Sequence, residues 1–287
     1  MHTKSELLEL LRERRIRLSK RLGQHYLIDP RLTVRLIDAC RLTTRDTVIE
    51  IGAGLGALTE GLAARAGQVV AVEVDRAVAA LLARRMAPYP NVQAVCQDIL
   101  SFAWERHPDS IVVGAIPYAI TSPILVMLGE RPVRIRTAWL GIQKEVATRL
   151  MAKPGTKAYG RLTVLVQYRF TVARVIAMPR QAFFPVPAVD SVWIRLTPKP
   201  AHVFGVRDER LFFEVVRAAF SQRRKTLLNG LGRLTAVRLT RPEALELIRA
   251  VGLPERVRGE TLSLEQFAAL ANTLTQRRGS IDLSGWV

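Results

Sequence analysis

A carboxylate and a run of glycines stand together in the stretch Glu50-Ile-Gly52-Ala-Gly54-Leu-Gly56, between an apolar run and a pattern typical of a helix. Glycines at such a turn let the backbone approach a ligand without interference from a Cβ atom. Glu73 ends the next apolar run, where a carboxylate would meet ribose hydroxyls. The spacing predicts a site for a cofactor that contains a nucleoside.

The glycine spacing leaves the class of cofactor open. Gly52, Gly54 and Ala57 also satisfy the dinucleotide pattern G-x-G-x-x-A, so they fit S-adenosylmethionine or a nicotinamide or flavin dinucleotide. A tight turn that binds no ligand is a third interpretation. Asp98 closes the following apolar run, where it could accept a hydrogen bond from an adenine amino group or simply cap a helix.

A further apolar run ends in Gly114-Ala-Ile-Pro117-Tyr118. A proline followed by an aromatic residue at the edge of a sheet would make a rigid loop with a face on which a flat substrate can stack. Taken alone, a Pro-Tyr pair is more often an ordinary turn.

Short apolar runs alternate with helical patterns from Thr47 onward. Strands are predicted in TVIEIGAG, QVVAVEVD, NVQAVCQD and SIVVGAIPY, and helices at 57–66 and 76–86. This alternation predicts βαβ units and a parallel sheet, with the functional residues at the carboxyl ends of the strands.

Beyond Ile135 the stretches TAWLGIQ, RLTVLVQYRFTVARVI and SVWIRLTP are predicted strands, and KPAHVFGVRDE has the turn signals of a linker. Helical spacing then predicts helices at 211–220, 242–251 and 263–274. Charged and apolar residues at 5–18 predict a basic amphipathic helix or arm.

The composition is that of a folded protein with a basic surface. The 287 residues include 43 Lys and Arg against 25 Asp and Glu, a net charge of +18, and 49% are hydrophobic. Such a chain can bury a sizeable core, and its charge attracts polyanions, of which nucleic acid is the commonest. A charge that serves solubility alone is the alternative.

The sequence gives little support to a disulfide framework, a metal site, a secretory signal or a membrane span. Cys40 and Cys96, without a CxxC motif, predict neither a disulfide framework nor a metal site, and both are expected to be buried. The first residues lack the apolar core of a secretory signal. The uncharged stretch 111–129 is interrupted by glycine and proline, which predicts a strand, a loop and a helix start rather than a membrane span. We expect a cytoplasmic protein.

Several motifs together carry a family resemblance. They follow one another as LGQHYLID, VIEIGAGLGALT, AVEVD, QDIL, IPYAITSPIL, QKEVATRL, FFPVPAVDSV and AFSQRRKTLLNGL. Through them the chain resembles the bacterial small-subunit ribosomal RNA adenine dimethyltransferases, and it is also similar to the erythromycin-resistance methyltransferases of 23S rRNA. The last two motifs favour the small-subunit enzymes. The resemblance implies S-adenosylmethionine as the cofactor.

The resemblance implies an α/β fold, with a Rossmann-like S-adenosylmethionine-dependent methyltransferase domain over residues 22–198. A basic helix or arm over 1–21 would precede it, and a smaller all-helical domain over 206–287 would follow. The implied function is N6-dimethylation of two adjacent adenines near the 3′ end of 16S rRNA during small-subunit assembly. The implied partner is 16S rRNA in the small ribosomal subunit, and we expect a monomer that needs no metal or membrane.

The resemblance also implies site residues. Cofactor contacts are expected at Gln24, His25, Leu27, Gly52, Gly54, Gly56, Glu73, Asp98 and Ala115. The target adenine would meet Ala115, Pro117, Tyr118 and Phe183 or Phe184. RNA contacts are expected at Arg14, Arg15, Arg17, Lys20, Arg21, Arg223, Arg224 and Lys225, with solvated helix faces as the alternative.

Three positions depart from the family pattern. His25 stands where Asn is usual, and an imidazole can still form hydrogen bonds. Ala115 replaces the Asn whose side chain accepts a hydrogen bond from the adenine amino group, and Ala119 replaces an Asn that often follows the Tyr. Losing one positioned polar group at a reacting centre is expected to cost about 3 kcal/mol, roughly a hundredfold in rate.

Two other functions stay open beside the dimethyltransferase. Ala115 is consistent with a catalytically impaired RNA-binding factor in ribosome assembly, and the second similarity with a 23S rRNA methyltransferase that confers macrolide resistance. A dinucleotide-dependent oxidoreductase would need neither the basic surface nor the Pro-Tyr and Phe-Phe-Pro elements.

Overall fold

The computed structural model describes residues 4–13, 23–131, 133–200, 203–222 and 225–284. The internal contacts divide the chain into two units. The first comprises Met1–Ala147 and Phe170–Pro198, and the second comprises Thr148–Arg169 and Lys199–Val287. Each unit has a hydrophobic core of its own.

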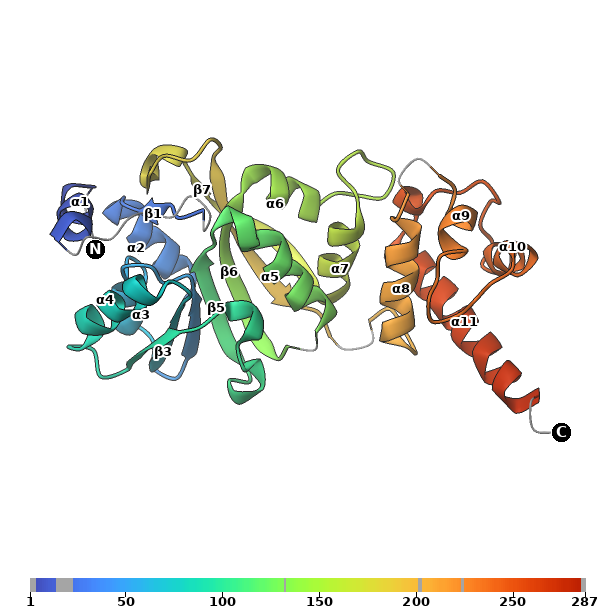
Figure 1. The fold of residues 1–287 in the computed structure, drawn as a ribbon, viewed down its shortest axis with the longest axis horizontal. Helices are drawn as coiled ribbons and strands as arrows, with labels where there is room; N and C mark the ends of the chain where they lie inside the picture. Colours follow the sequence, from blue (N-terminus) through green and yellow to red (C-terminus); the bar gives the residue numbers. More distant parts are fainter. Residues whose placement is uncertain (1–3, 14–22, 132, 201–202, 223–224, 285–287) are drawn as a thin grey trace. The chain divides into compact units, whose positions relative to one another are not determined.

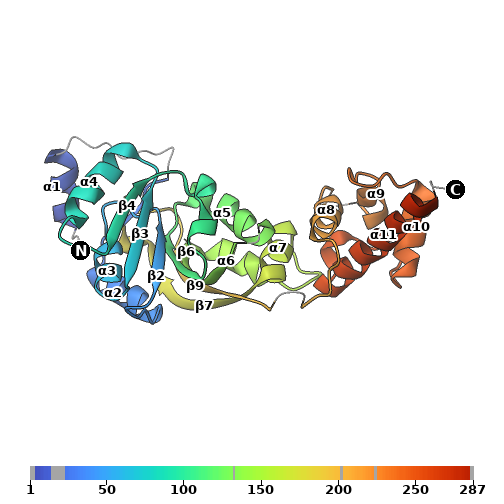
Figure 2. The same cartoon turned by 90° about the horizontal axis from the view of Figure 1, so that it is seen from below.

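The first unit is built on a seven-stranded sheet with the order β4-β3-β2-β5-β6-β9-β7, whose elements are shown in Figures 1 and 2. Strands β2 to β6 pair in parallel, whereas β9 is antiparallel to both of its neighbours. The strands are Thr47–Ile51 (β2), Gln68–Glu73 (β3), Val92–Cys96 (β4), Ser110–Ala115 (β5), Ile135–Gln143 (β6), Phe170–Met178 (β7) and Ser191–Pro198 (β9). The central strands are nearly continuous buried runs, as is typical of parallel sheets. The predicted parallel sheet is confirmed.

Two of the helices in this unit, α2 and α4, begin at aspartate caps. Asp29 and Asp75 each accept a hydrogen bond of 2.9 Å from a backbone amide in the first turn of the helix that follows. The stretch 111–129 forms a strand and a helix joined by a short loop, as predicted. The helices are α1 (Lys4–Glu13), α2 (Pro30–Ala39), α3 (Thr59–Ala63), α4 (Arg76–Met86), α5 (Tyr118–Glu130) and α6 (Lys144–Leu150).

A small second sheet joins two segments that lie far apart in the sequence. Strand β1 (Tyr26–Leu27) pairs antiparallel with β8 (Phe183–Phe184), so that Tyr26 is opposite Phe184 and Leu27 is opposite Phe183. The backbone amide of Ile28 continues the connection with a 2.8 Å hydrogen bond to the carbonyl of Ala182. The FFPVP motif is thereby fixed beside the motif that contains Gln24 and His25.

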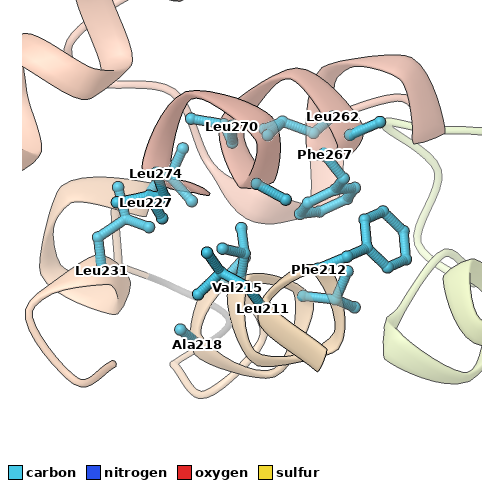
Figure 3. Packing of buried hydrophobic residues seen from close by; sticks show 14 of the residues in the cluster. Leu211, Phe212, Val215, Ala218, Leu227, Leu231, Leu262, Phe267, Leu270 and Leu274 are labelled. Atoms are coloured by element: carbon cyan, nitrogen blue, oxygen red, sulfur yellow. The ribbon is translucent and has the colours of Figure 1, made fainter. Parts of the chain in front are cut away.

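The second unit is helical. Its helices are α7 (Arg161–Arg169), α8 (Glu209–Ala219), α9 (Leu227–Leu231), α10 (Arg241–Ala250) and α11 (Leu264–Ser284). Figure 3 shows Phe212 and Val215 of α8 packed with Leu227 of α9 and Phe267 of α11. All four side chains are completely buried, as is typical of a close-packed hydrophobic core.

The strand predicted for the stretch RLTVLVQYR is wrong: Arg161–Arg169 forms helix α7. Its β-branched residues favour a strand locally, and a short apolar run does not distinguish a strand from a buried helix. Val164 and Tyr168, one helical turn apart, pack into the core of the second unit. The unit boundary therefore differs from the expected 22–198 domain, because Thr148–Arg169 belongs with the helical unit.

Two further findings concern the cysteines and the question of a membrane span. Cys40 is buried as predicted, but Cys96 is exposed, because it ends β4 at the edge of the sheet. Within the described ranges, no helix combines the length and the hydrophobicity that crossing a membrane requires.

Candidate functional site

A pocket of about 190 Å³ lies in the first unit, at the carboxyl ends of the parallel strands. Gly56 faces away from the pocket, since a Cβ atom there would meet Leu82 and Met86 of α4 at 3.1 Å. All the other predicted cofactor-binding residues line the pocket: Gln24, His25, Leu27, Gly52, Gly54, Glu73, Asp98 and Ala115.

Glu73 ends β3 and holds the glycine turn through backbone hydrogen bonds. Its Oε2 accepts from the amide of Gly54 and its Oε1 from the amide of Asp75, both at 2.9 Å. Burial raises the pKa of Glu73, while these two amides act in the opposite direction. Each carboxylate oxygen has a second lone pair, so the side chain can still accept hydrogen bonds from a ligand.

The glycine turn is shaped by close neighbours. Gly52 and Gly54 have φ angles of +66° and +56°, a region that favours glycine. A Cβ atom on Gly54 would lie 3.0 Å from Cε1 of Tyr26, and one on Gly52 would lie 3.3 Å from Cδ of Pro117. The segment around Tyr26 and the loop after β5 therefore close over the turn.

Glu50 is a pocket residue that sequence reasoning used only as the first letter of the glycine motif. It lines the pocket from β2, is 2% exposed, and accepts a 2.6 Å hydrogen bond from Oγ1 of Thr59. Burial raises the pKa of Glu50 to about 8, and the nearby Glu73 adds to the rise. The place of Glu50 at the end of a buried strand was the signal that could have identified it.

Asp98 forms the predicted helix cap and also lines the pocket, so its contact with an adenine amino group stays a prediction. Its Oδ1 accepts a 2.9 Å hydrogen bond from the amide of Leu100 and so caps the short helix Ile99–Ser101, and its side chain also lines the pocket. Val74, which follows Glu73, lines the same region and is 49% exposed. Sequence reasoning missed Val74 because a lone valine carries no polar signal.

The end of the pocket beyond β5 is apolar. Ala115, Pro117, Ala119 and Ile120 line it. The carbonyl of Pro117 accepts a 3.1 Å hydrogen bond from the amide of Ile120, which starts helix α5 at this point. Ala115 and Ala119 offer the pocket only methyl groups from their side chains.

His25 and Tyr118 lie together beside this apolar end. Their ring centroids are 5.6 Å apart, and Nδ1 of His25 donates a 2.6 Å hydrogen bond to the carbonyl of Pro185. The hydroxyl of Tyr118 is 2.8 Å from Oγ of Ser191, and burial raises the pKa of Tyr118. Tyr118 itself does not line the pocket, but it contacts His25, which does.

The two phenylalanines of the FFPVP motif have different environments. Phe183 is 5% exposed and packs in the core with Leu27 and Trp193, so its ring has no free face for a base. Phe184 is only partly buried, and Nζ of Lys4 lies 5.2 Å from the centre of its ring. Of the two predicted stacking residues, Phe184 is thus the less buried, and neither of them lines the pocket.

Most of the predicted RNA-binding residues fall outside the described ranges. These are Arg14, Arg15, Arg17, Lys20, Arg21, Arg223 and Arg224. Lys225 is described, and it is exposed in the loop between α8 and α9. Among the residues that the structure describes, no group of His, Cys, Asp and Glu side chains could hold a metal ion.

Comparison with known proteins gives a consistent result at the level of sequence. A family model described as ribosomal RNA adenine dimethylase matches residues 15–276. The ribosomal RNA small subunit methyltransferases A of Bacillus mycoides (strain KBAB4) and Bacillus cereus (strain AH187) are each 45% identical over 264 residues, 89% of this chain and 90% of the relative.

Solved structures agree with the sequence matches. A dimethyladenosine transferase from Plasmodium falciparum is similar with a TM-score of 0.74 and 26% identity, covering 87% of this chain and 97% of that one. The 23S rRNA methyltransferase ErmE is similar with a TM-score of 0.63 and 29% identity, covering 88% of this chain and all of that one. The Rossmann-like fold with a C-terminal helical region is confirmed. The chain belongs to the ribosomal RNA adenine dimethylase family.

Proposed function

We propose that this protein dimethylates N6 of two adjacent adenines near the 3′ end of 16S rRNA, with S-adenosylmethionine as the methyl donor. The observation that carries the proposal is a pocket in which Glu73 and Asp98 line one part and Ala115 and Pro117 line another. Such a pocket can hold an adenosine-containing donor next to an acceptor base. Family membership and the 45% identity to small-subunit enzymes support the choice of substrate over 23S rRNA.

The residues present fit S-adenosylmethionine. The glycine turn is free of Cβ atoms where a ligand would approach it, and Glu73 keeps acceptor capacity for ribose hydroxyls. Asp98 would accept from the adenine amino group of the donor. When bound, S-adenosylmethionine supplies a methyl group on a positively charged sulfur that leaves as a neutral thioether.

The chain's own part in the reaction is to orient the target base. The base must leave its stack in the RNA to reach the pocket, and Tyr118 and Phe184 would receive its faces. The loop from Ala115 to Pro117 would hold the amine in line with the methyl group, which is how positioning accelerates a transfer of this kind. After transfer the nitrogen releases one proton for each methyl group gained.

The basic surface would hold the RNA. A net charge of +18 supports salt-dependent phosphate contacts, which position the substrate without reading its sequence. We assign this role to the predicted arginines and lysines at 14–21 and 223–225, including Lys225. A ribosomal substrate implies a cytoplasmic protein, and we expect it to act as a monomer.

Ala115 favours one alternative, a factor that binds the small subunit without methylating it. The test is incorporation of label from S-adenosylmethionine into unmethylated small subunits by the natural chain and by Ala115→Asn, together with a subunit-binding assay. Incorporation by both proteins supports the proposal. Incorporation by the variant alone, with equal binding, would replace it with the assembly factor. Mass spectrometry of the 3′ end of the RNA gives the modified nucleotides and the number of methyl groups.

A further inference from the structure

The acceptor end of the pocket lacks a side-chain hydrogen-bond acceptor from its own loop. Ala115 and Ala119 present methyl groups there, and Pro117 and Ile120 are apolar. An adenine amine that enters this end carries two N–H groups, and a buried N–H without a partner is unfavourable. The inference that follows rests on the proposed function and concerns the group that replaces the missing acceptor.

His25 is a polar residue that lines the pocket and belongs to a segment packed against this loop. A Cβ atom on Gly23 would lie 3.7 Å from the amide nitrogen of Ala119 and 3.9 Å from that of Tyr118, so the segment before His25 packs on the start of α5. The imidazole is also 5.6 Å from the Tyr118 ring, centre to centre. It is therefore held beside the same loop that carries Ala115.

The hydrogen bond to Pro185 determines which ring nitrogen is available. A carbonyl oxygen can only accept, so the 2.6 Å contact requires that Nδ1 carries the hydrogen. In the neutral ring Nε2 is then an acceptor. Pro185 does not line the pocket, whereas His25 does, and no described residue forms a hydrogen bond with Nε2.

The acidic side chains that line the pocket, and the side chain of Gln97, form hydrogen bonds with groups outside the loop after β5. Glu73 holds the glycine turn, Glu50 is bonded to a threonine of α3, and Asp98 caps a helix on the cofactor side. The side-chain amide of Gln97 donates to a backbone carbonyl of that same short helix. None of these contacts involves the loop after β5.

We propose that Nε2 of His25 accepts a hydrogen bond from the exocyclic amine of the target adenine and thereby replaces the acceptor that Ala115 lacks. In the transfer, the amine nitrogen bonds to the methyl carbon while the carbon–sulfur bond breaks and its electron pair stays on sulfur. The nitrogen then gives one proton along the hydrogen bond to Nε2, and the imidazolium returns it to water. His25 is on this view a catalytic residue as well as a cofactor neighbour.

The test compares two substitutions of His25 in two backgrounds. His25→Asn places an amide near the position of Nδ1 and keeps a donor for Pro185, but it does not reach the position of Nε2. His25→Gln places an amide near Nε2 and keeps an acceptor there. Both substitutions are made in the natural chain and in Ala115→Asn. For each protein, kcat is measured for the methylation of small subunits. The affinity for S-adenosylhomocysteine is measured separately by calorimetry.

We expect His25→Asn to lower kcat by about a hundredfold in the natural chain, as for loss of one positioned polar group. His25→Gln should retain most of the rate. In the Ala115→Asn background the loss of kcat should shrink to about threefold or less, because the side chain introduced at position 115 then supplies an acceptor for the same amine. Affinity for S-adenosylhomocysteine should fall by a smaller factor than kcat in the proteins that carry the His25 changes, since the contact that the inference concerns is to the substrate.

Equal losses of kcat in both backgrounds would overturn the inference, as would an affinity for S-adenosylhomocysteine that falls in step with kcat. Either result would make His25 a cofactor residue only. If the natural chain methylates and His25→Asn has no effect, the inference fails and the proposed function stands. If the natural chain incorporates no methyl group, both fail, because His25 then replaces nothing.

Discussion

The two ends of the pocket differ in how completely their polar groups are organised. At the cofactor end, Glu50, Glu73 and Asp98 each form hydrogen bonds that fix a turn or a helix start. At the acceptor end, the side chains of Ala115 and Ala119 contribute only methyl groups, and His25, which belongs to a distant segment, lies beside the loop that carries them. Under the proposed function, residues at the strand ends would bind the methyl donor, whereas a segment outside the seven-stranded sheet would help to orient the acceptor base.

The largest effect is expected from Glu73→Gln. The side-chain amide of the introduced Gln cannot accept hydrogen bonds from the backbone amides of both Gly54 and Asp75, because its nitrogen is itself a donor. We expect affinity for S-adenosylhomocysteine to fall about a hundredfold, near 3 kcal/mol, as for loss of hydrogen bonds to a charged group. Calorimetry measures this, with circular dichroism to check folding. An affinity within about threefold of the natural chain would contradict the assigned role of the cofactor end.

The glycine turn gives the next prediction. Gly54→Ala forces a side chain into a left-handed conformation and against the Tyr26 ring at 3.0 Å, so we expect a loss of about 2 kcal/mol in the free energy of unfolding. Gly155→Ala is the matched control, because Gly155 has φ +81° but no atom within 4 Å of the position that a Cβ atom would occupy. The control should cost only about 1 kcal/mol. Equal losses on urea unfolding would show that the Tyr26 contact contributes nothing.

Glu50 should make stability depend on pH. Its folded pKa is raised to about 8 from 4.5, so between these values the folded protein binds more protons than the unfolded chain. Stability from this group is therefore present below pH 4.5 and is lost as the pH rises toward 8, at up to about 1.4 kcal/mol per pH unit. The free energy of unfolding of Glu50→Gln, measured with urea between pH 6 and pH 8, should fall less steeply with pH than that of the natural chain. If the free energy of unfolding of the two proteins depends on pH in the same way, Glu50 does not contribute to the pH dependence.

The smallest effect is expected at the acceptor end. Ala115→Asn should raise kcat about threefold rather than the hundredfold expected from the alanine alone, because His25 already provides an acceptor. The affinity for S-adenosylhomocysteine serves as the control and should not change. A rise near a hundredfold would show that the acceptor end of the natural chain has no working substitute.

The cofactor end could be predicted from sequence because its residues follow the ends of consecutive parallel strands. Gly52, Glu73 and Asp98 all lie where strand order and strand length place them. The acceptor end depends on pairing between segments that no local pattern specifies. The sequence could not show which of Phe183 and Phe184 is buried, because a register shift of one residue exchanges their faces.

The helix at Arg161–Arg169 illustrates a different limit. Its residues have strand propensity, and the same apolar run continues directly into the true strand β7. The helix is stabilised by packing in the second unit, where Tyr168 and Val164 meet α8 and its neighbours. Local sequence cannot report such contacts, since they involve residues beyond position 203.

The pairing of Leu27 with Phe183 and the bond from His25 to Pro185 also govern when the site can form. These contacts span about 160 residues of chain. During synthesis on the ribosome, the glycine turn and Glu73 emerge long before Phe183, so the pocket stays incomplete until the later segment is available. Closing so long a loop is slow compared with forming local structure. An unfinished chain therefore contains the glycine turn and Glu73 but lacks the segment that pairs with Leu27 and holds His25.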